Sequence, residues 1–397
     1  MGILDAPGLS LAQARRQVAV PCANRAFPPN LASSNLSDGV ITSATYRLTH
    51  TVTKTSHSVR LAFINAYNNL GNEVNGLNDI TIRASIEPSA GSPVPVFFGG
   101  KRTTVVEPGA VIFSDPVAIE LTQGATIFTR TYVQVASGGK WPLGISTSGT
   151  RAGEGNTIGA SAGADWTTSA WNVGSTTIAG TAYGPASIVG IPATVAKKTT
   201  IVVGDSIADG VGEAAPNQNI GYVERGLGYT DISYQKLAYP SAGISNFSSP
   251  SSAARKQLIP AVATDAIVEL GINAVASGAT FATLQTSFLN IWNELNRRGL
   301  KVWQTTLTPS TTSTDAWATL ANQSPQSFEA VRVQINNWIR TTPAPLAGYL
   351  EIADLAESDR NSGKWRVDLG QPSTDGVHPT TAVATAMAAG VPAASFK

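Results

Sequence analysis

The chain has 397 residues, enough for two or three domains, with 13% charged residues and a formal net charge of +1. A nucleic-acid-binding surface needs clustered lysine and arginine, which this sequence lacks, so nucleic acid is not expected as a partner. The single cysteine, Cys22, excludes an internal disulfide framework, and no nearby cysteine or histidine completes a zinc pattern. No apolar run approaches the ~20 residues of a membrane-spanning helix. We therefore expect no metal, no cofactor and no membrane span.

Residues 1–29 are expected to form a separate N-terminal segment. Its arginines, Arg15 and Arg16, follow the apolar residues, and Asp5 and Pro7 interrupt any apolar core, so the segment lacks the order of a signal peptide. A short helix is predicted from Ser10 onward. Such a start fits a cytoplasmic or phage-borne protein, or a mature secreted chain given a new methionine, and we favour an extracellular location.

Residues 30–190 are predicted to form an all-β domain. From about 40 to 137, segments rich in Thr, Val, Ile and Tyr alternate with period two and are separated by turn-forming residues. Several short strands without intervening helices indicate a β-sandwich, of jelly-roll-like type. From about 146 to 184 the chain becomes loop-like and low in charge, and Trp166 and Trp171 argue against disorder because disordered segments are poor in aromatic residues.

Residues 198–397 are predicted to form a three-layer α/β domain, after a linker near 190 to 198. A helix is expected between the third and fourth strands, another at a cap formed by Ser324 and Pro325, and a last one near Thr380. Strands that alternate with helices form a parallel sheet covered on both faces. The expected strands are 199–204, 232–238, 265–271, 301–307 and 349–354.

Residues of types that take part in catalysis follow several of these strands. Asp205 and Ser206 follow the first strand, at the sheet edge where α/β proteins bind ligands, although such a turn by itself is better explained as an ordinary helix start. His378 is the only histidine of the predicted α/β domain, so a serine that needs a base there most simply uses it. Asp375 stands three residues earlier on a glycine-containing turn, within reach of the imidazole. Taken alone, this second turn is more often structural.

Together these segments resemble the SGNH hydrolases, also called the GDSL-like lipase/acylhydrolase family. The family's first block, Gly-Asp-Ser-hydrophobic-x-x-Gly, matches residues 204–210, and its fifth block, Asp-x-x-His, matches residues 375–378. Its third block, Gly-x-Asn-Asp, is represented by residues 271–273, and Gly243 is the candidate for the second block. The four blocks occur in the family's order over roughly residues 199 to 390.

The resemblance implies a flavodoxin-like sheet and ester hydrolysis by a serine. In it, Ser206 is the nucleophile, His378 is the general base and Asp375 orients the imidazole. The oxyanion is held by the backbone N–H groups of Ser206 and Gly243 and by the side-chain amide of Asn273, each of which strengthens as charge develops.

Two alanines depart from the family pattern. Ala208 stands where many members carry Thr, and Ala274 stands where the third block usually ends in Asp. Neither is expected to touch the reacting carbonyl, although the packing of the third-block loop is put in doubt. Asp205 is expected to accept hydrogen bonds from nearby backbone amides rather than to act in catalysis.

The leading functional prediction is a carbohydrate esterase that removes small acyl groups, acetyl being favoured, and its expected substrate is a polysaccharide or an acylated small molecule. Some SGNH esterases that act on polysaccharides carry a β-sandwich ahead of the hydrolase domain, and this chain is similar in outline. Trp166 and Trp171 are expected either to stack on sugar rings or to pack against the hydrolase domain. The alternatives are a general short-chain carboxylesterase or lipase and, in another class, a glycan-binding or virion structural module that retains the hydrolase fold.

Overall fold

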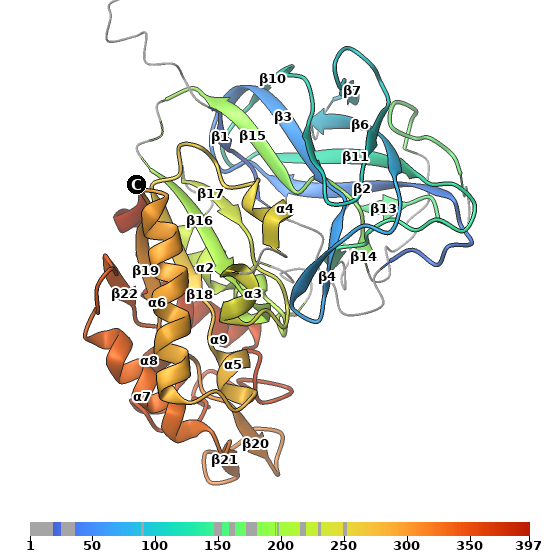
Figure 1. The fold of residues 1–397 in the computed structure, drawn as a ribbon. Helices are drawn as coiled ribbons and strands as arrows, with labels where there is room; N and C mark the ends of the chain where they lie inside the picture. The colour runs from blue at the N-terminus through green and yellow to red at the C-terminus, as the bar shows by residue number, and fades with distance from the viewer. Residues whose placement is uncertain are drawn as a thin grey trace, which may run out of the picture.

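A computed structural model describes residues 19–24, 36–88, 91–146, 153–158, 163–171, 181–194, 196, 198–214, 220–228, 232–248 and 252–397. The short helix expected from Ser10 lies outside the described residues. We call residues 19–194 the β half and residues 198–397 the α/β half; Figure 1 shows them side by side. Among the described helices, none is both long and apolar enough to cross a membrane.

The β half is built from short antiparallel strands. They are β1 Val20–Pro21, β2 Ser43–Thr51, β3 Ser56–Ile64, β4 Ala66–Asn69, β5 Asn72–Asn75, β6 Ile80–Pro88, β7 Val94–Pro95, β8 Thr104–Val106, β9 Val111–Phe113, β10 Val117–Leu121, β11 Thr126–Gln134, β12 Ile145–Ser146, β13 Gly155–Asn156, β14 Thr181–Ala182 and β15 Ser187–Pro192. One sheet has the order β1-β15-β3-β10, with β9 also paired to β3. A second has the order β13-β2-β11-β6-β7, with β8 also paired to β6. Two smaller pairs, β4 with β5 and β12 with β14, complete the set described.

The period-two pattern of the sequence explains how these two sheets pack. Along β6, Ile80, Ile82 and Ile86 point to one side and are fully buried. They belong to the same hydrophobic cluster as Leu61 of β3 and Ile188 of β15, which lie in the other sheet. The two sheets therefore enclose one shared core.

The α/β half contains a parallel sheet. Its strands and helices are β16 Thr199–Gly204, α1 Ser206–Asp209, α2 Gly221–Leu227, β17 Ser233–Lys236, α3 Ile244–Ser248, α4 Ala253–Lys256, β18 Asp265–Glu269, α5 Ile272–Ala276, α6 Phe281–Arg297, β19 Lys301–Thr305, β20 Thr311–Ser313, β21 Gln323–Pro325, α7 Glu329–Arg340, β22 Gly348–Leu350, α8 Ala353–Ala356, α9 Thr381–Met387, and the 3-10 helices η2 Ala388–Gly390 and η3 Ala393–Phe396. The parallel sheet has the order β17-β16-β18-β19-β22. In chain order this is 2-1-3-4-5, the flavodoxin-like arrangement.

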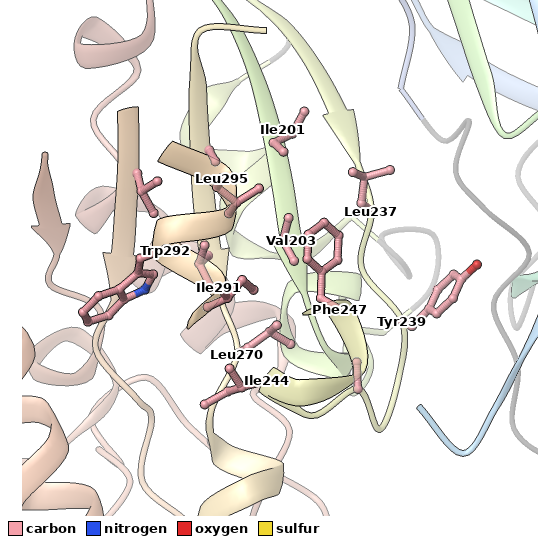
Figure 2. Packing of buried hydrophobic residues seen from close by; sticks show 14 of the residues in the cluster. Ile201, Val203, Leu237, Tyr239, Ile244, Phe247, Leu270, Ile291, Trp292 and Leu295 are labelled. Atoms are coloured by element: carbon pink, nitrogen blue, oxygen red, sulfur yellow. The ribbon is translucent and has the colours of Figure 1, made fainter. Parts of the chain in front are cut away.

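Helices cover both faces of this sheet, as predicted. Ile201 and Val203 of β16 pack in one hydrophobic cluster with Ile291 of α6, and Figure 2 shows these side chains together. Val202, between them in sequence, points to the opposite face and packs in a second cluster with Val223 of α2. The first predicted strand is confirmed at its predicted bounds, and the other four are present but shorter, the last of them also beginning one residue earlier than predicted.

The predicted helix start at Ser324 and Pro325 is wrong. These residues belong to β21, which pairs with β20, and α7 begins only at Glu329. The side-chain amide of Gln323 bonds to both the backbone N–H and the carbonyl of Trp365, which holds the segment extended. Proline lacks an N–H group but is tolerated in a short edge strand of this kind.

The β4–β5 hairpin joins the two halves through a buried carboxylate. Glu73 accepts hydrogen bonds from the backbone N–H groups of Ala254 (2.7 Å) and Arg255 (3.0 Å) and from the Tyr239 hydroxyl (3.3 Å). The guanidinium of Arg255 lies 3.8 Å from Glu73 and 4.1 Å from the centre of the Tyr239 ring. Burial raises the pKa of Glu73, although the hydrogen bonds and the Arg255 charge oppose that shift. In Figure 2 the Tyr239 hydroxyl points away from the labelled core residues.

We expect Glu73→Ala to destabilise the protein by about 3–5 kcal/mol, because it leaves the buried Arg255 guanidinium without its counter-charge. Urea denaturation would measure the loss. The control is Glu120→Ala, since the Glu120 side chain is 86% exposed and should change stability by no more than about 0.5 kcal/mol. Equal stabilities of the two variants would contradict a joining role for Glu73.

Candidate active site

The turn after β16 places Ser206 at the carboxyl edge of the parallel sheet. Asp205 caps α1 by accepting a 2.9 Å hydrogen bond from the backbone N–H of Ile207, as expected for a structural acceptor. The packing at Gly204 is tight, because a Cβ atom there would lie only 2.4 Å from the Ala208 methyl group. A small residue at position 208 is therefore compatible with this turn, where many SGNH members carry Thr.

The structure brings Ser206, His378 and Asp375 into one hydrogen-bonded chain. His378 Nε2 lies 2.8 Å from Ser206 Oγ, and His378 Nδ1 lies 2.6 Å from Asp375 Oδ2. The other oxygen of Asp375 accepts hydrogen bonds of 2.9 Å from the backbone N–H groups of Val377 and His378. Partial burial alone would raise the pKa of Asp375, but these hydrogen bonds lower it well below its ordinary value. Asp375 is therefore ionised at neutral pH.

Close backbone contacts fix the loop that carries Asp375 and His378. Gly376 has φ +82°, and a Cβ atom there would lie 1.8 Å from the Thr311 carbonyl oxygen. Its own carbonyl accepts a 2.9 Å hydrogen bond from the indole of Trp365. On the other side, a Cβ atom at Gly212 would lie 2.8 Å from the His378 Cβ. The loop therefore depends on glycine at two positions.

The two other predicted oxyanion donors, Gly243 just before α3 and Asn273 in the first turn of α5, already have acceptors. The Asn273 amide nitrogen donates to Asp205 Oδ2 (3.2 Å) and to the Ala242 carbonyl (3.1 Å). The Gly243 backbone N–H donates to Asn246 Oδ1 (2.5 Å), in the manner of a helix cap for α3. A substrate oxygen has to share or replace these acceptors.

Glu269, the last residue of β18, is a buried carboxyl group that sequence analysis missed. Its Oε2 accepts hydrogen bonds of 3.2 Å from the backbone N–H groups of Asp205 and Ala208. Burial raises the pKa of Glu269 well above its ordinary value and raises the pKa of Asp205 to about 6. Burial therefore favours the protonated form of this carboxyl pair. The signal in the sequence was a glutamate inside the otherwise apolar run "AIVEL".

The Glu269→Gln variant tests whether the Glu269 carboxyl group binds a proton in the folded protein. Because burial raises the pKa of Glu269 above its unfolded value, the folded state binds more protons than the unfolded chain, and stability must fall as pH rises. We expect the free energy of unfolding of the wild type to fall more steeply between pH 5 and pH 8 than that of Glu269→Gln, whose amide preserves the hydrogen bonds. Urea denaturation across this pH range would measure both slopes, and equal slopes would contradict a protonated Glu269.

Trp166 and Trp171 lie in the β half. Their rings meet edge to face with centres 6.2 Å apart, and both residues are half-buried. Trp171 lies 5.4 Å from the Arg130 guanidinium and 5.9 Å from that of Arg47. Both arginines project from the second sheet on the side away from its hydrophobic core. Within the described part of the chain, the contacts of this tryptophan pair are with the β half rather than with Ser206 or His378.

No family model matches the sequence, and no curated protein matches it. Similar solved structures include a GDSL-like lipase from Bacteroides thetaiotaomicron, which is 13% identical over 48% of this chain and 84% of its own (TM-score 0.32). A family two carbohydrate esterase from Clostridium thermocellum is 13% identical over 87% of this chain and 92% of its own (TM-score 0.36). A salicylyl-acyltransferase from a tetracycline biosynthetic pathway is 12% identical over 84% and 79%, respectively (TM-score 0.36). The lipase carries the name of the family that the sequence motifs resemble.

Proposed function

We propose that this chain is a serine ester hydrolase of the SGNH type that removes small acyl groups, above all acetyl, from a carbohydrate. The observation that carries the proposal is the hydrogen-bonded chain from Asp375 through His378 to Ser206 at the carboxyl edge of the sheet. A serine hydroxyl is a weak nucleophile until a base takes its proton. The imidazole lies 2.8 Å from that hydroxyl, within the distance that proton transfer needs.

The mechanism follows from these contacts. Ser206 Oγ forms a bond to the acyl carbonyl carbon as His378 Nε2 takes the hydroxyl proton, and the imidazolium then gives this proton to the leaving alcohol. Water attacks the acyl-enzyme by the same route, which releases the acid and restores Ser206. Asp375, ionised at neutral pH, keeps the Nδ1–H tautomer of His378 in place and stabilises the imidazolium.

Three N–H donors are proposed to hold the oxyanion: the backbone N–H groups of Ser206 and Gly243 and the side-chain amide of Asn273. Each such donor is worth about 10²–10³ in rate when it is aimed at developing charge. The Gly243 bond to Asn246 and the Asn273 bonds to Asp205 and Ala242 would be shared with the oxyanion or exchanged for it.

A small acyl group is favoured by the make-up of the loops around Ser206. They are rich in Gly, Ser, Asn, Pro and Ala, and the large aromatic residues Tyr239 and Phe247 are fully buried in the core. A long alkyl chain needs a continuous apolar groove, at about 0.8 kcal/mol per buried methylene. These loops contain too few large apolar side chains to form the walls of such a groove.

We also infer that residues 30–190 form a β-sandwich accessory domain for the hydrolase domain of residues 198–397. The shared core of two antiparallel sheets supports this division. Trp166 and Trp171 are proposed to offer a glycan an aromatic surface on this domain, since each ring is only half-buried.

Ser206→Ala and His378→Ala are each expected to lower kcat on 4-nitrophenyl acetate by at least about 10³, because the members of such a triad act as a unit. Asp375→Asn is expected to cause a smaller but still large loss. The matched control is His57→Ala, because the His57 side chain is 55% exposed in the β half and its loss should leave kcat unchanged. Near-normal activity in His378→Ala would eliminate the proposed mechanism.

Chain length separates the proposed deacetylase from a lipase. With 4-nitrophenyl esters, kcat/KM is expected to be highest for acetate and to fall by butyrate or hexanoate, because the loops lack an apolar groove. A steady-state series from acetate to octanoate would measure the trend. A preference for octanoate would identify the protein as a lipase instead.

A further inference from the structure

A cavity opens beside the proposed oxyanion donors. Its volume is about 480 Å³, and both Gly243 and Asn273 line it. The remaining walls come from the start of α3, the end of α5, the first turns of α6 and one residue of the β half, Leu70. This volume lies in the range of ordinary small-molecule sites, and it is far larger than an acetyl group needs.

The β4–β5 hairpin carries Leu70 to this cavity. A Cβ atom at Gly71, the next residue, would lie 2.2 Å from the Ser241 carbonyl oxygen, so the hairpin turn packs directly on the loop that leads to Gly243. The Asn68 amide donates a 2.9 Å hydrogen bond to the Pro240 carbonyl on the same loop. These contacts place a residue from the β half at the cavity that the proposed donors Gly243 and Asn273 line.

Leu70 itself has two unusual features. It is 63% exposed, and its backbone has φ +52°, a left-handed conformation that a leucine adopts at an energetic cost. Such strained residues cluster at ligand sites. Leu70 is therefore an apolar side chain held open to solvent at the cavity rather than buried for stability.

A hydrogen-bond chain links the same hairpin to an oxyanion donor. The Asn246 amide nitrogen donates to Asn72 Oδ1 of the hairpin (2.5 Å), while Asn246 Oδ1 accepts from the Gly243 N–H (2.5 Å). The hairpin is anchored by Glu73 next to Asn72, as described above. The β half thus supports the donor loop as well as the cavity wall.

The walls of the cavity are more polar than apolar and carry no charge, and Leu70, Ile244 and Leu284 are their larger apolar residues. Hydroxyl groups come from Ser241, Ser245, Ser277, Thr283 and Ser287, and no charged side chain belongs to the lining described. Ser277 and Thr283 already bond to Asn273 and Thr280, but an alkyl chain would remove the hydroxyls of Ser245 and Ser287 from water without giving them partners, which is costly. A sugar ring suits them, because its hydroxyls bond to the walls and its C–H face packs on Leu70.

We propose that this cavity is the subsite for the alcohol portion of the ester, a neutral hydroxyl-rich ring, and that Leu70 of the β half is a specificity-determining residue in its wall. The proposal rests on the proposed function, because a small acyl group leaves the cavity free for the alcohol. The substrate site is then formed jointly by the two halves.

Blocking the cavity tests its location. Cys22, the only cysteine, is fully buried, so a maleimide bearing polyethylene glycol will label Leu70→Cys selectively. We expect labelling to lower kcat/KM for 6-O-acetylglucose at least about tenfold relative to unlabelled Leu70→Cys. The control is Leu77→Cys, because Leu77 is similarly exposed (59%) in the β half but lies at a different cavity. Labelled Leu70→Cys that remains as active as labelled Leu77→Cys would overturn the proposal.

Two esters with six-carbon alcohols test the chemistry. Wild-type kcat/KM for 6-O-acetylglucose is expected to exceed that for hexyl acetate at least about tenfold, because the walls hydrogen-bond hydroxyl groups. The Ser245→Ala/Ser287→Ala double variant should reduce this ratio. Thr286→Ala should preserve it, because Thr286 is an exposed residue of α6, next to Ser287, that does not line the cavity. A wild-type ratio below one, or a ratio that the double variant leaves unchanged, would overturn the subsite. Absence of wild-type activity on 4-nitrophenyl acetate would instead overturn the proposed function, and the subsite with it.

Discussion

The turn between β16 and α1 is the constraint on which the rest of the site depends. Its backbone N–H groups at Asp205 and Ala208 are held by Glu269 of the neighbouring strand β18, and the Asp205 side chain in turn accepts from Ile207 and Asn273. Burial favours a proton on the two adjacent carboxyl groups, so the turn is supported without repulsion between two buried negative charges. Because this turn determines where Ser206 lies, the distance from its hydroxyl to His378 depends on all of these contacts.

Local patterns in the sequence were sufficient for part of this structure. The apolar run before Gly204 predicted β16 at its observed bounds, and the spacing of apolar residues predicted α6, because both signals are contained within one element. The residues 204–206 and 375–378 were selected by their order along the chain and their places after strands. The structure then brought Ser206, Asp375 and His378 together.

The features that sequence analysis missed depend on distant partners. Ser324 and Pro325 look like a helix start, but pairing with β20 and the bonds from Gln323 to Trp365 favour a strand. Glu73 bonds to the backbone of Arg255, 182 residues away, and the periodicity of the sequence cannot predict a contact between such distant residues. Sequence analysis missed Glu269 for the same reason, because its role depends on the turn that follows a different strand, β16.

The two halves are joined by more than a linker. Ala62 and Ile64 of β3 belong to the same hydrophobic cluster as Leu237 and Val268 of the α/β half, and the β4–β5 hairpin adds a buried ion pair and the wall residue Leu70. A β half fixed in this way supports the loop that carries Gly243. Its contribution to function is then expected to be positional, through the shape of the site, as well as through any glycan surface of its own.

Reaction with a fluorophosphonate, followed by tandem mass spectrometry, tests the central claim most directly. The account predicts one covalent adduct, located on Ser206 and lost in Ser206→Ala, because His378 activates only the hydroxyl beside it. An adduct on a different serine, or none in the folded wild-type protein, would contradict the account.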